Sequence, residues 1–470
     1  MRITRNTEME QNTSSTRSLL HFAWPVLVAQ LALMANSVID TAMAGRLSAI
    51  DLASVGIAAT IMSTILMSLI SVLMALPPII AQLYGAGQRD KIGREIHQSI
   101  WISLVLALVA ILLLHYPEPF IWVSELQPPM EIKVRAYLDA SVWGIPATIA
   151  LRLFFGLSTG IGRPLPVMTF NLLALCLKIP LNSVFMFGLL GIPAMGAPGC
   201  AVATAIDAWL LASIAWLWCL NHPNYREFKI LVRFSAPDFS AIWEFLRLGI
   251  PIGLTFIADM TAFTFMALFI ARLGPIVSGA HQIASNLAVV AFMFPLSLGT
   301  ATAVLAGQAI GAGQSEQARH LCWVGIRLGM IIALIISLIF WLGAPHIAAL
   351  YTTDPQVQAA AIPLIILVAF YHLGDAIQAV AINALRGYKK SAVPMVIYTT
   401  TLWGVGLGGG YLLGLTNTFG QAQGAGGFWL AAIISLWLVA CLVAIYLNTV
   451  SKANLNKQSL MNYAKILPQK

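Results

Sequence analysis

The sequence predicts an all-α integral membrane protein with twelve transmembrane helices in two homologous six-helix lobes. Composition is the first reason. Of the residues, 59% are hydrophobic and 9% are charged, and the mean hydropathy is +0.84, which is typical of a chain that lies in lipid. Most charged residues lie in short stretches between apolar runs of roughly 20 residues, the length that crosses a bilayer core.

The number of apolar runs is the second reason. We place the twelve predicted spans at residues 19–43, 53–82, 96–115, 137–160, 165–190, 199–220, 244–271, 279–308, 322–343, 356–384, 391–414 and 427–448.

An internal repeat is the third reason. A shift of 226 positions places Pro25 on Pro251 and Gly85-Ala86-Gly87-Gln88 on Gly311-Ala312-Gly313-Gln314 without a gap. Because each half carries six spans, the halves have the same polarity, and a pseudo-two-fold axis along the membrane normal relates such repeats. The predicted parts are a cytoplasmic N-terminal segment (1–18), a first lobe (19–220), a cytoplasmic linker (221–240), a second lobe (241–448) and a cytoplasmic tail (449–470), which we expect to be unstructured.

Lysine and arginine are distributed unevenly between the two predicted sides of the membrane. Outside the spans, one side receives only Arg46, Lys133, Arg135 and Arg272, and the side of the chain termini receives all the others. Cytoplasmic loops carry the excess of positive charge, so we expect both termini in the cytoplasm. The net charge of +8 therefore reflects membrane orientation, and we expect no nucleic-acid partner.

Four acidic residues lie well inside predicted spans: Asp40, Asp207, Asp259 and Asp375, whereas Asp139 lies at the outer mouth of the fourth span, where we expect an interfacial residue. A carboxylate in hydrocarbon is costly and is normally functional. Asp259 and Asp375 both fall near mid-membrane when a rise of about 1.5 Å per residue is counted. Two neighbouring carboxylates in low dielectric need a proton, Na⁺ or a cationic substrate between them. Competition for such a site is what an antiporter requires.

Lys178 is the single lysine deep inside a predicted span. An ion pair with Asp207 on the next span is the simplest explanation, and a pair with Asp40 is the alternative. His372 lies three residues from Asp375 on one helical face, and we favour packing or hydrogen bonding for it over proton transfer. The other polar residues within spans that are candidates for a site are Asn182, Asn286, Tyr371 and Gln378.

Motifs for other functions are absent or misplaced. Gly404–Gly409 satisfies GxGxxG, but it lies inside an apolar span with no strand before it, which favours helix packing. The sequence contains neither a P-loop nor an HExxH motif, so we expect no enzyme activity and no cofactor. The five cysteines fall in apolar runs without metal-binding spacing, and we expect them in the core.

Three groups of residues resemble the MATE family of multidrug and toxic compound extrusion transporters, in its bacterial NorM-like branch. They are Asp40 to Ser48, Ala280 to Ile283, and Gly374 to Gln378 with Leu385 to Tyr388. The resemblance implies two lobes that form a V. It also implies export of cationic amphipathic drugs and dyes by antiport with Na⁺ or H⁺ and alternating access. We expect a monomer among the lipids of the bacterial inner membrane, with Na⁺ or H⁺ as the coupling ion.

The family's functional residues correspond to individual positions of this sequence. Its first-lobe acid corresponds to Asp40, and its second-lobe cation site corresponds to Asp259 and Asp375, with Tyr371 nearby. Asp259 departs from the branch, which usually has Glu there. The side chain is one methylene shorter, and we expect this to loosen a Na⁺ site built on two carboxylates.

Lys178 is a second departure, because the branch usually has Asn at this position. A tethered ammonium beside Asp40, Asn182 and Thr204 would stand in for Na⁺ there. We therefore expect that the first lobe does not bind Na⁺ and that coupling runs through the two second-lobe acids.

Three other functions remain as alternatives. A lipid-linked oligosaccharide flippase of the same superfamily would need a cationic groove, and the buried acids disfavour it. An intramembrane enzyme would need a catalytic cluster, which the sequence does not display. A membrane scaffold without transport would have no use for acids in mid-membrane.

Overall fold

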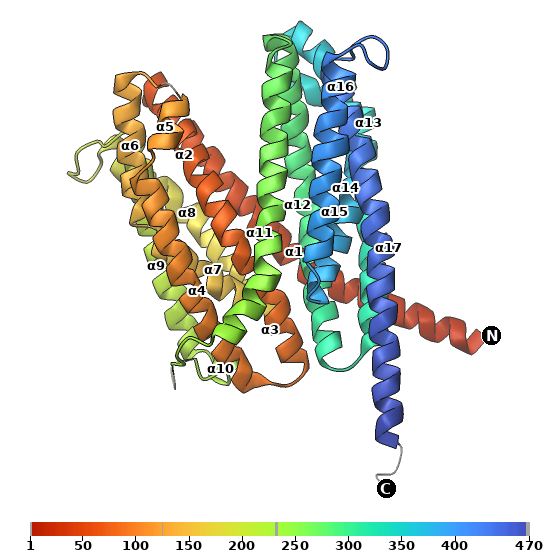
Figure 1. Ribbon diagram of the computed structural model, residues 1–470. Helices are drawn as coiled ribbons and strands as arrows, with labels where there is room; N and C mark the ends of the chain where they lie inside the picture. The colour runs from red at the N-terminus through yellow and green to blue at the C-terminus, as the bar shows by residue number, and fades with distance from the viewer. Residues whose placement is uncertain (1, 125, 231–233, 467–470) are drawn as a thin grey trace. The chain divides into compact units, whose positions relative to one another are not determined.

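The computed structural model describes residues 2–124, 126–230 and 234–466. Within these ranges every regular element is a helix, and most helices run side by side in bundles (Figure 1). Ten helices are long and apolar enough to cross a membrane, and the adjoining helices α6 and α7, which meet at 51°, form a further candidate span. The chain is therefore a multi-pass membrane protein.

The helices of the first half are α1 (Arg2–Gly45), α2 (Ala49–Ile70), the 3₁₀-helix η1 (Ser71–Ala75), α3 (Leu76–Gly85), α4 (Arg89–His115), α5 (Glu118–Ser124), α6 (Pro128–Val142), α7 (Ile145–Gly160), α8 (Leu165–Phe187), α9 (Ala197–Asn221) and α10 (Pro223–Arg226). Those of the second half are α11 (Phe239–Ala271), α12 (Pro275–Gly311), α13 (Ser315–Tyr351), α14 (Pro355–Gly387), α15 (Ala392–Thr401), the π-helix η2 (Leu402–Gly408), α16 (Gly409–Leu415) and α17 (Ala425–Ile466).

The predicted span at 391–414 is not a single regular helix. It consists of α15, η2 and α16 in direct succession. The glycines of the GxGxxG run lie in η2 and at the start of α16, and a Cβ on Gly406 would lie 3.3 Å from Ser435 Oγ of α17. The run therefore serves close packing of helices, as predicted. Together with the ten long helices and the bent pair, this segment accounts for the twelve predicted spans.

Two expectations about the chain were wrong. The tail from residue 449 was expected to be unstructured, but α17 continues to Ile466, because this stretch has no glycine or proline to end the helix. The five cysteines were all expected in the core. Three of them are buried, whereas Cys176 and Cys441 are exposed on helices that present apolar side chains outward.

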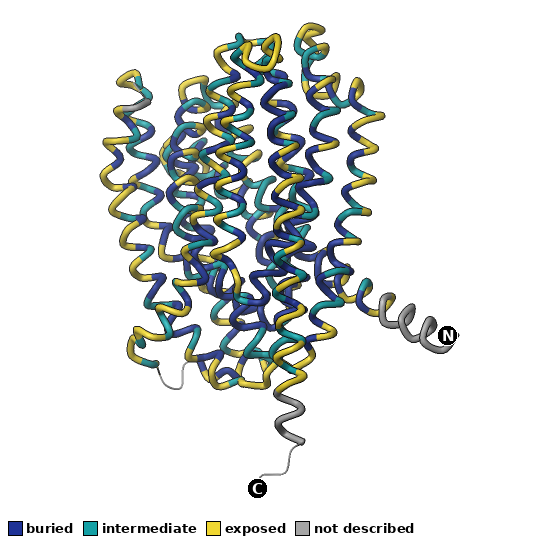
Figure 2. The backbone as a smooth tube through the Cα atoms, turned by 45° about the vertical axis from the view of Figure 1, so that its right-hand side comes forward, coloured by how far each residue is buried: buried dark blue, intermediate teal, exposed yellow. Residues whose placement is uncertain are grey.

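The outward faces of several helices carry large apolar side chains. Leu104, Leu108 and Leu112 of α4 recur every four residues, and each is about half exposed. Figure 2 shows such exposed positions alternating with buried ones along the outer helices. In water such a surface would be unfavourable, but against lipid tails it is the expected one.

The described helices belong to two compact units. We name Val28–Gly253 the N-unit, and Met1–Leu27 together with Leu254–Lys470 the C-unit. The boundaries fall inside α1 and α11, two residues after the repeat prolines Pro25 and Pro251, so the predicted linker at 221–240 belongs to the N-unit.

Candidate functional site

The N-unit contains a buried ion pair on α1 and α8. The Lys178 ammonium lies 3.0 Å from Asp40 Oδ2 and donates to Thr204 Oγ1 of α9 at 2.5 Å. Asn182 Nδ2 donates to Asp40 Oδ1 at 2.7 Å. Lys178 and Asn182 are one helical turn apart on α8, so both face the same partner, and they are 3% and 0% exposed. The structure thus brings together four predicted site residues.

Asp207 is the acid that Lys178 was first expected to bind, and this expectation was wrong. Lys178 pairs with Asp40 instead. Asp207 lies one turn from Thr204 on α9 and is buried, and its Oδ1 has no hydrogen-bond partner among the described residues. Asp207 was expected as the partner because its span directly follows the span of Lys178. The carboxylate instead comes from α1, which is distant in sequence.

The C-unit contains a second group of acids, on α11 and α14. Asp375 is 4% exposed, and its Oδ1 accepts from Gln378 Nε2 at 2.9 Å. Asp259 Oδ1 accepts from the Tyr398 hydroxyl of α15 at 2.5 Å. Asp259 and Asp375 are within electrostatic range of each other and of Tyr371. Predicted residues from α11 and α14 therefore meet in one cluster.

Aromatic rings form one wall of this acid cluster. Tyr371 lies edge-on to Phe263 and Trp429, with ring centroids 6.4 Å and 5.5 Å apart. Phe263 is one turn beyond Asp259 on α11, and Tyr371 is one turn before Asp375 on α14. Rings at these positions offer π-faces to a cation near the carboxylates.

Of two further predicted residues, Asn286 lies outside the acid cluster and His372 lies beside Asp375. Asn286 is exposed on α12 and accepts from the Tyr351 hydroxyl at 2.7 Å, so the structure does not join it to the acids. His372 is 1% exposed, its Nδ1 is 4.0 Å from Asp375 Oδ2, and neither ring nitrogen has a hydrogen-bond partner within the described part of the chain. Packing, rather than hydrogen bonding, describes His372 in this structure.

Tyr398 is the residue of the cluster that the sequence analysis missed. It begins the run Tyr398-Thr399-Thr400-Thr401 inside an otherwise apolar span. Four consecutive hydroxyl side chains in such a span are a polar signal in themselves.

The two groups of acids differ in their counter-charge. In the N-unit, Asp40 has its own ammonium. In the described part of the C-unit, neither Asp259 nor Asp375 has a lysine or arginine within ion-pair distance, and the described residues contain no group of three His, Cys, Asp or Glu side chains that would hold a metal ion. A cation at Asp259 and Asp375 would therefore rely on two carboxylates with hydroxyl and amide oxygens.

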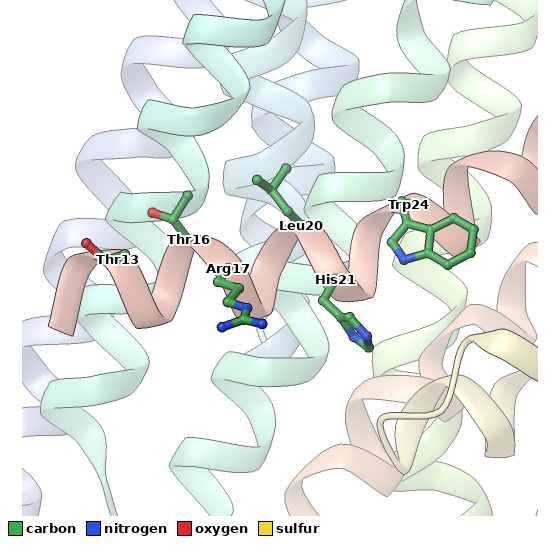
Figure 3. Close-up of a pocket in the computed structure, with 6 residues that line it drawn as sticks. All are labelled: Thr13, Thr16, Arg17, Leu20, His21 and Trp24. Atoms are coloured by element: carbon green, nitrogen blue, oxygen red, sulfur yellow. The ribbon is translucent and has the colours of Figure 1, made fainter. Parts of the chain in front are cut away.

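A separate pocket of about 650 Å³ lies along the beginning of α1 (Figure 3). Its lining residues recur every three or four positions and so form one helix face. None of them is acidic. They are Thr13, Thr16, Arg17, Leu20, His21 and Trp24.

Comparison with known proteins identifies the family. The MatE family model matches the chain twice, over residues 25–184 and 251–412. The two matches begin at Pro25 and Pro251, the first pair of the internal repeat. The chain belongs to the MatE family.

MatE relatives cover nearly the whole chain. A probable multidrug resistance protein NorM of Chromobacterium violaceum is 38% identical over 94% of this chain and 96% of its own length. The multidrug resistance protein MdtK of Yersinia pseudotuberculosis is 33% identical over 94% and 97%. A crystal structure of a MATE protein in the bent conformation has a TM-score of 0.86 at 16% identity and covers 96% of this chain and 98% of its own. The predicted fold class and the NorM-like resemblance are confirmed.

Proposed function

We propose that this MatE protein is a secondary active multidrug efflux transporter of the bacterial inner membrane. It exports cationic amphipathic compounds in exchange for Na⁺ or H⁺ by alternating access, with both chain termini in the cytoplasm. The observation that carries the proposal is the pair of acids Asp259 and Asp375, which share one cluster in a membrane-spanning unit and have no lysine or arginine partner among the described residues. The names of the NorM and MdtK relatives support the substrate class.

The acids provide a reason for exchange. Two carboxylates near each other in low dielectric repel, and a bound cation or proton relieves this repulsion. A drug cation against the rings of Tyr371 and Phe263 competes with the coupling ion for the same negative charge. A ligand shifts a conformational equilibrium only by its differential affinity for the two states, so mutual exclusion of the two cations couples their movements.

We propose a different role for the N-unit, in which it does not bind Na⁺. Its acid Asp40 is already neutralised by Lys178, and Asn182 and Thr204 direct their polar atoms to this pair. A second cation would meet a fixed positive charge there. We therefore place Na⁺, where Na⁺ is the coupling ion, at Asp259 and Asp375 and not in the N-unit.

An efflux assay tests the proposal. Ethidium efflux is measured in membrane vesicles under an imposed Na⁺ or proton gradient, with Asp375→Asn and the double variant Asp259→Asn/Asp375→Asn. We expect ion-driven efflux to fall by at least about tenfold, which is roughly 1.4 kcal/mol of lost coupling. Asp139→Asn serves as the control because that carboxyl is 61% exposed. Unchanged ion-driven efflux in the double variant would contradict the role of the two acids, and no ion-driven efflux by the unaltered protein would favour a scaffold or a flippase.

A further inference from the structure

The charges of the cluster formed by Asp40, Lys178 and Asp207 do not balance. Asp40 and Lys178 form one neutral pair at 3.0 Å. Asp207 is a third ionisable group in the same place, because it lies one turn from Thr204, which accepts from Lys178, and it is within electrostatic range of both members of the pair. With all three groups ionised, the cluster would carry a net charge of −1 inside the membrane.

Among the residues that the structure describes, none offers Asp207 a further positive charge. The side chain is 8% exposed, and its Oδ1 has no hydrogen-bond partner among the described residues. On its own helix the nearest titratable group is the buried thiol of Cys200, which contacts the Tyr137 hydroxyl of α6. Neither group is a cation.

The charged residues of the other helices that pack on α9 lie elsewhere. Arg152 of α7 lies beside the part of α9 around Trp216, because the neighbouring carbonyl of Ala150 accepts from Trp216 Nε1. Trp216 is more than two helical turns beyond Asp207 on α9. On α6, Lys133 pairs with Asp51 of α2 at 2.6 Å. The remaining charges of α6 are paired or exposed at its outer part: Glu131, Arg135 and Asp139.

An ionised and unpartnered carboxylate is the costliest form that Asp207 can take in this position. A proton on its free oxygen removes the excess charge without requiring any other ligand. Na⁺ would require several oxygen ligands, yet Asp40 and Thr204 already direct their oxygens to the Lys178 ammonium. The cluster therefore accommodates a proton better than a metal ion.

Resting on the proposed antiport, we propose that Asp207, and not Asp40, is the carboxyl of the N-unit that binds and releases a proton. Lys178 acts as a positioning residue that supplies the counter-charge of Asp40 at 3.0 Å. In release, the O–H bond of the Asp207 carboxyl breaks, the electron pair stays on the oxygen and the proton passes to water. Asp207 is thus a proton site in the N-unit, in addition to the cation site that we propose at Asp259 and Asp375 of the C-unit.

Infrared difference spectroscopy tests this directly on the full chain in lipid nanodiscs. Spectra are recorded between acidic and alkaline buffer for the unaltered protein and for Asp207→Asn. We expect the unaltered protein to show the C=O band of a buried carboxylic acid that Asp207→Asn lacks. Because Asp259 and Asp375 are present in both proteins, their bands cancel, and the result is independent of the proposed ion exchange in the C-unit.

Lys178→Met separates this role from a structural one. Without the ammonium, Asp40 has no counter-charge, so we expect a second carboxylic acid band to appear. A merely structural Asp207 or Lys178 would change folding but would add or remove no such band. Asp139→Asn is the matched control and should leave the spectrum unchanged. Retention of the full band in Asp207→Asn, or no added band in Lys178→Met, would overturn the proposal.

Proton release on substrate binding gives a second readout. Ethidium is added to the purified protein in weakly buffered solution and the released protons are counted with a pH-sensitive dye. By linkage, binding that displaces a proton must release it, so Asp207→Asn should release about one proton fewer per ethidium bound. Equal release by the two proteins would contradict the assignment even if efflux itself is ion-driven.

Discussion

At the scale of single residues, the hydroxyl of Tyr398 competes with the cation that we propose for Asp259. It donates to Asp259 Oδ1 at 2.5 Å and so occupies one side of a carboxylate oxygen that a cation would use. A hydrogen bond to a charged group contributes about 1.5–3 kcal/mol. The bond therefore favours release of the coupling ion.

Tyr398→Phe removes this donor without removing the ring. We expect the half-saturating concentration of the coupling ion to fall about tenfold or more, because roughly 1.4 kcal/mol corresponds to a factor of ten. Maximal efflux should fall too, since the ion leaves more slowly. Ethidium efflux measured against Na⁺ or proton concentration checks both effects. Tyr411→Phe, whose side chain is 40% exposed, is the control and should behave as the unaltered protein.

Asp238 shows how one carboxylate starts a helix outside the membrane. Its Oδ1 accepts from the backbone N–H groups of Ser240 and Ala241 at 3.0 Å and 3.4 Å, at the beginning of α11. Arg94 lies 2.5 Å from Oδ2. These N–H groups first, and the guanidinium second, hold the pKa of Asp238 below its ordinary value. The carboxylate is thus favoured in the folded state.

A lowered pKa in the folded state means that the stabilisation is present at neutral pH and is lost as the pH falls through that pKa. We expect Asp238→Ala to lower the thermal midpoint at neutral pH, because the helix cap is lost. The difference from the unaltered protein should shrink in acid. Thermal unfolding of both proteins at several pH values is the measurement. A difference that stays constant into strong acid would mean that the carboxylate charge is not what stabilises the helix end.

At the scale of elements, Asp51 joins three parts of the N-unit. It lies in the first turn of α2, accepts from Lys133 Nζ of α6 at 2.6 Å, and accepts from the backbone N–H of Ala197 at the start of α9 at 2.9 Å. Ser48 contributes its hydroxyl at 2.6 Å. Gly196 must lack a side chain here, because a Cβ would lie 2.8 Å from Asp51 Oδ1 and its φ is +64°.

Asp51→Asn should destabilise the N-unit measurably. Removing one partner of a fully buried ion pair costs about 3–5 kcal/mol, and since Lys133 is 35% exposed we expect a smaller loss of about 2 kcal/mol. The free energy of unfolding in detergent, compared with Asp139→Asn, is the measurement. Both variants remove one negative charge, so equal stabilities would rule out the geometric role of Asp51.

The spans themselves were the predictable part of these elements. Apolar runs of membrane length are a sequence property, and they gave all twelve spans together with the acids that lie in them. The partner of Lys178 was not predictable in the same way, because it depends on which helix packs beside α8 and not on sequence distance. Tyr398 and the helical end of α17 were missed for a different reason, because neither resembles a familiar motif.

At the scale of the whole molecule, the repeat and the compact units are offset from each other. The repeat starts at Pro25 and Pro251, whereas the units change at Leu27–Val28 and Gly253–Leu254. Both α1 and α11 therefore begin in one unit and continue in the other. Each carries its proline at the crossing, where the missing backbone hydrogen bond leaves the helix easier to bend. Two equivalent helices thus cross between the units at equivalent weak points.

Bending of these two helices at their prolines is a testable part of the proposed alternating access. Pro25→Ala restores the backbone donor and stiffens α1, so we expect efflux of ethidium to fall several-fold while the thermal midpoint stays the same or rises. Pro251→Ala should act in the same way on α11.

Pro363→Ala is the matched control, because that proline lies inside α14, away from both unit boundaries, and should leave efflux unchanged. If all three variants were equally active, bending at the repeat prolines would have no part in transport. If the first two lost efflux together with stability, their prolines would serve packing and not motion.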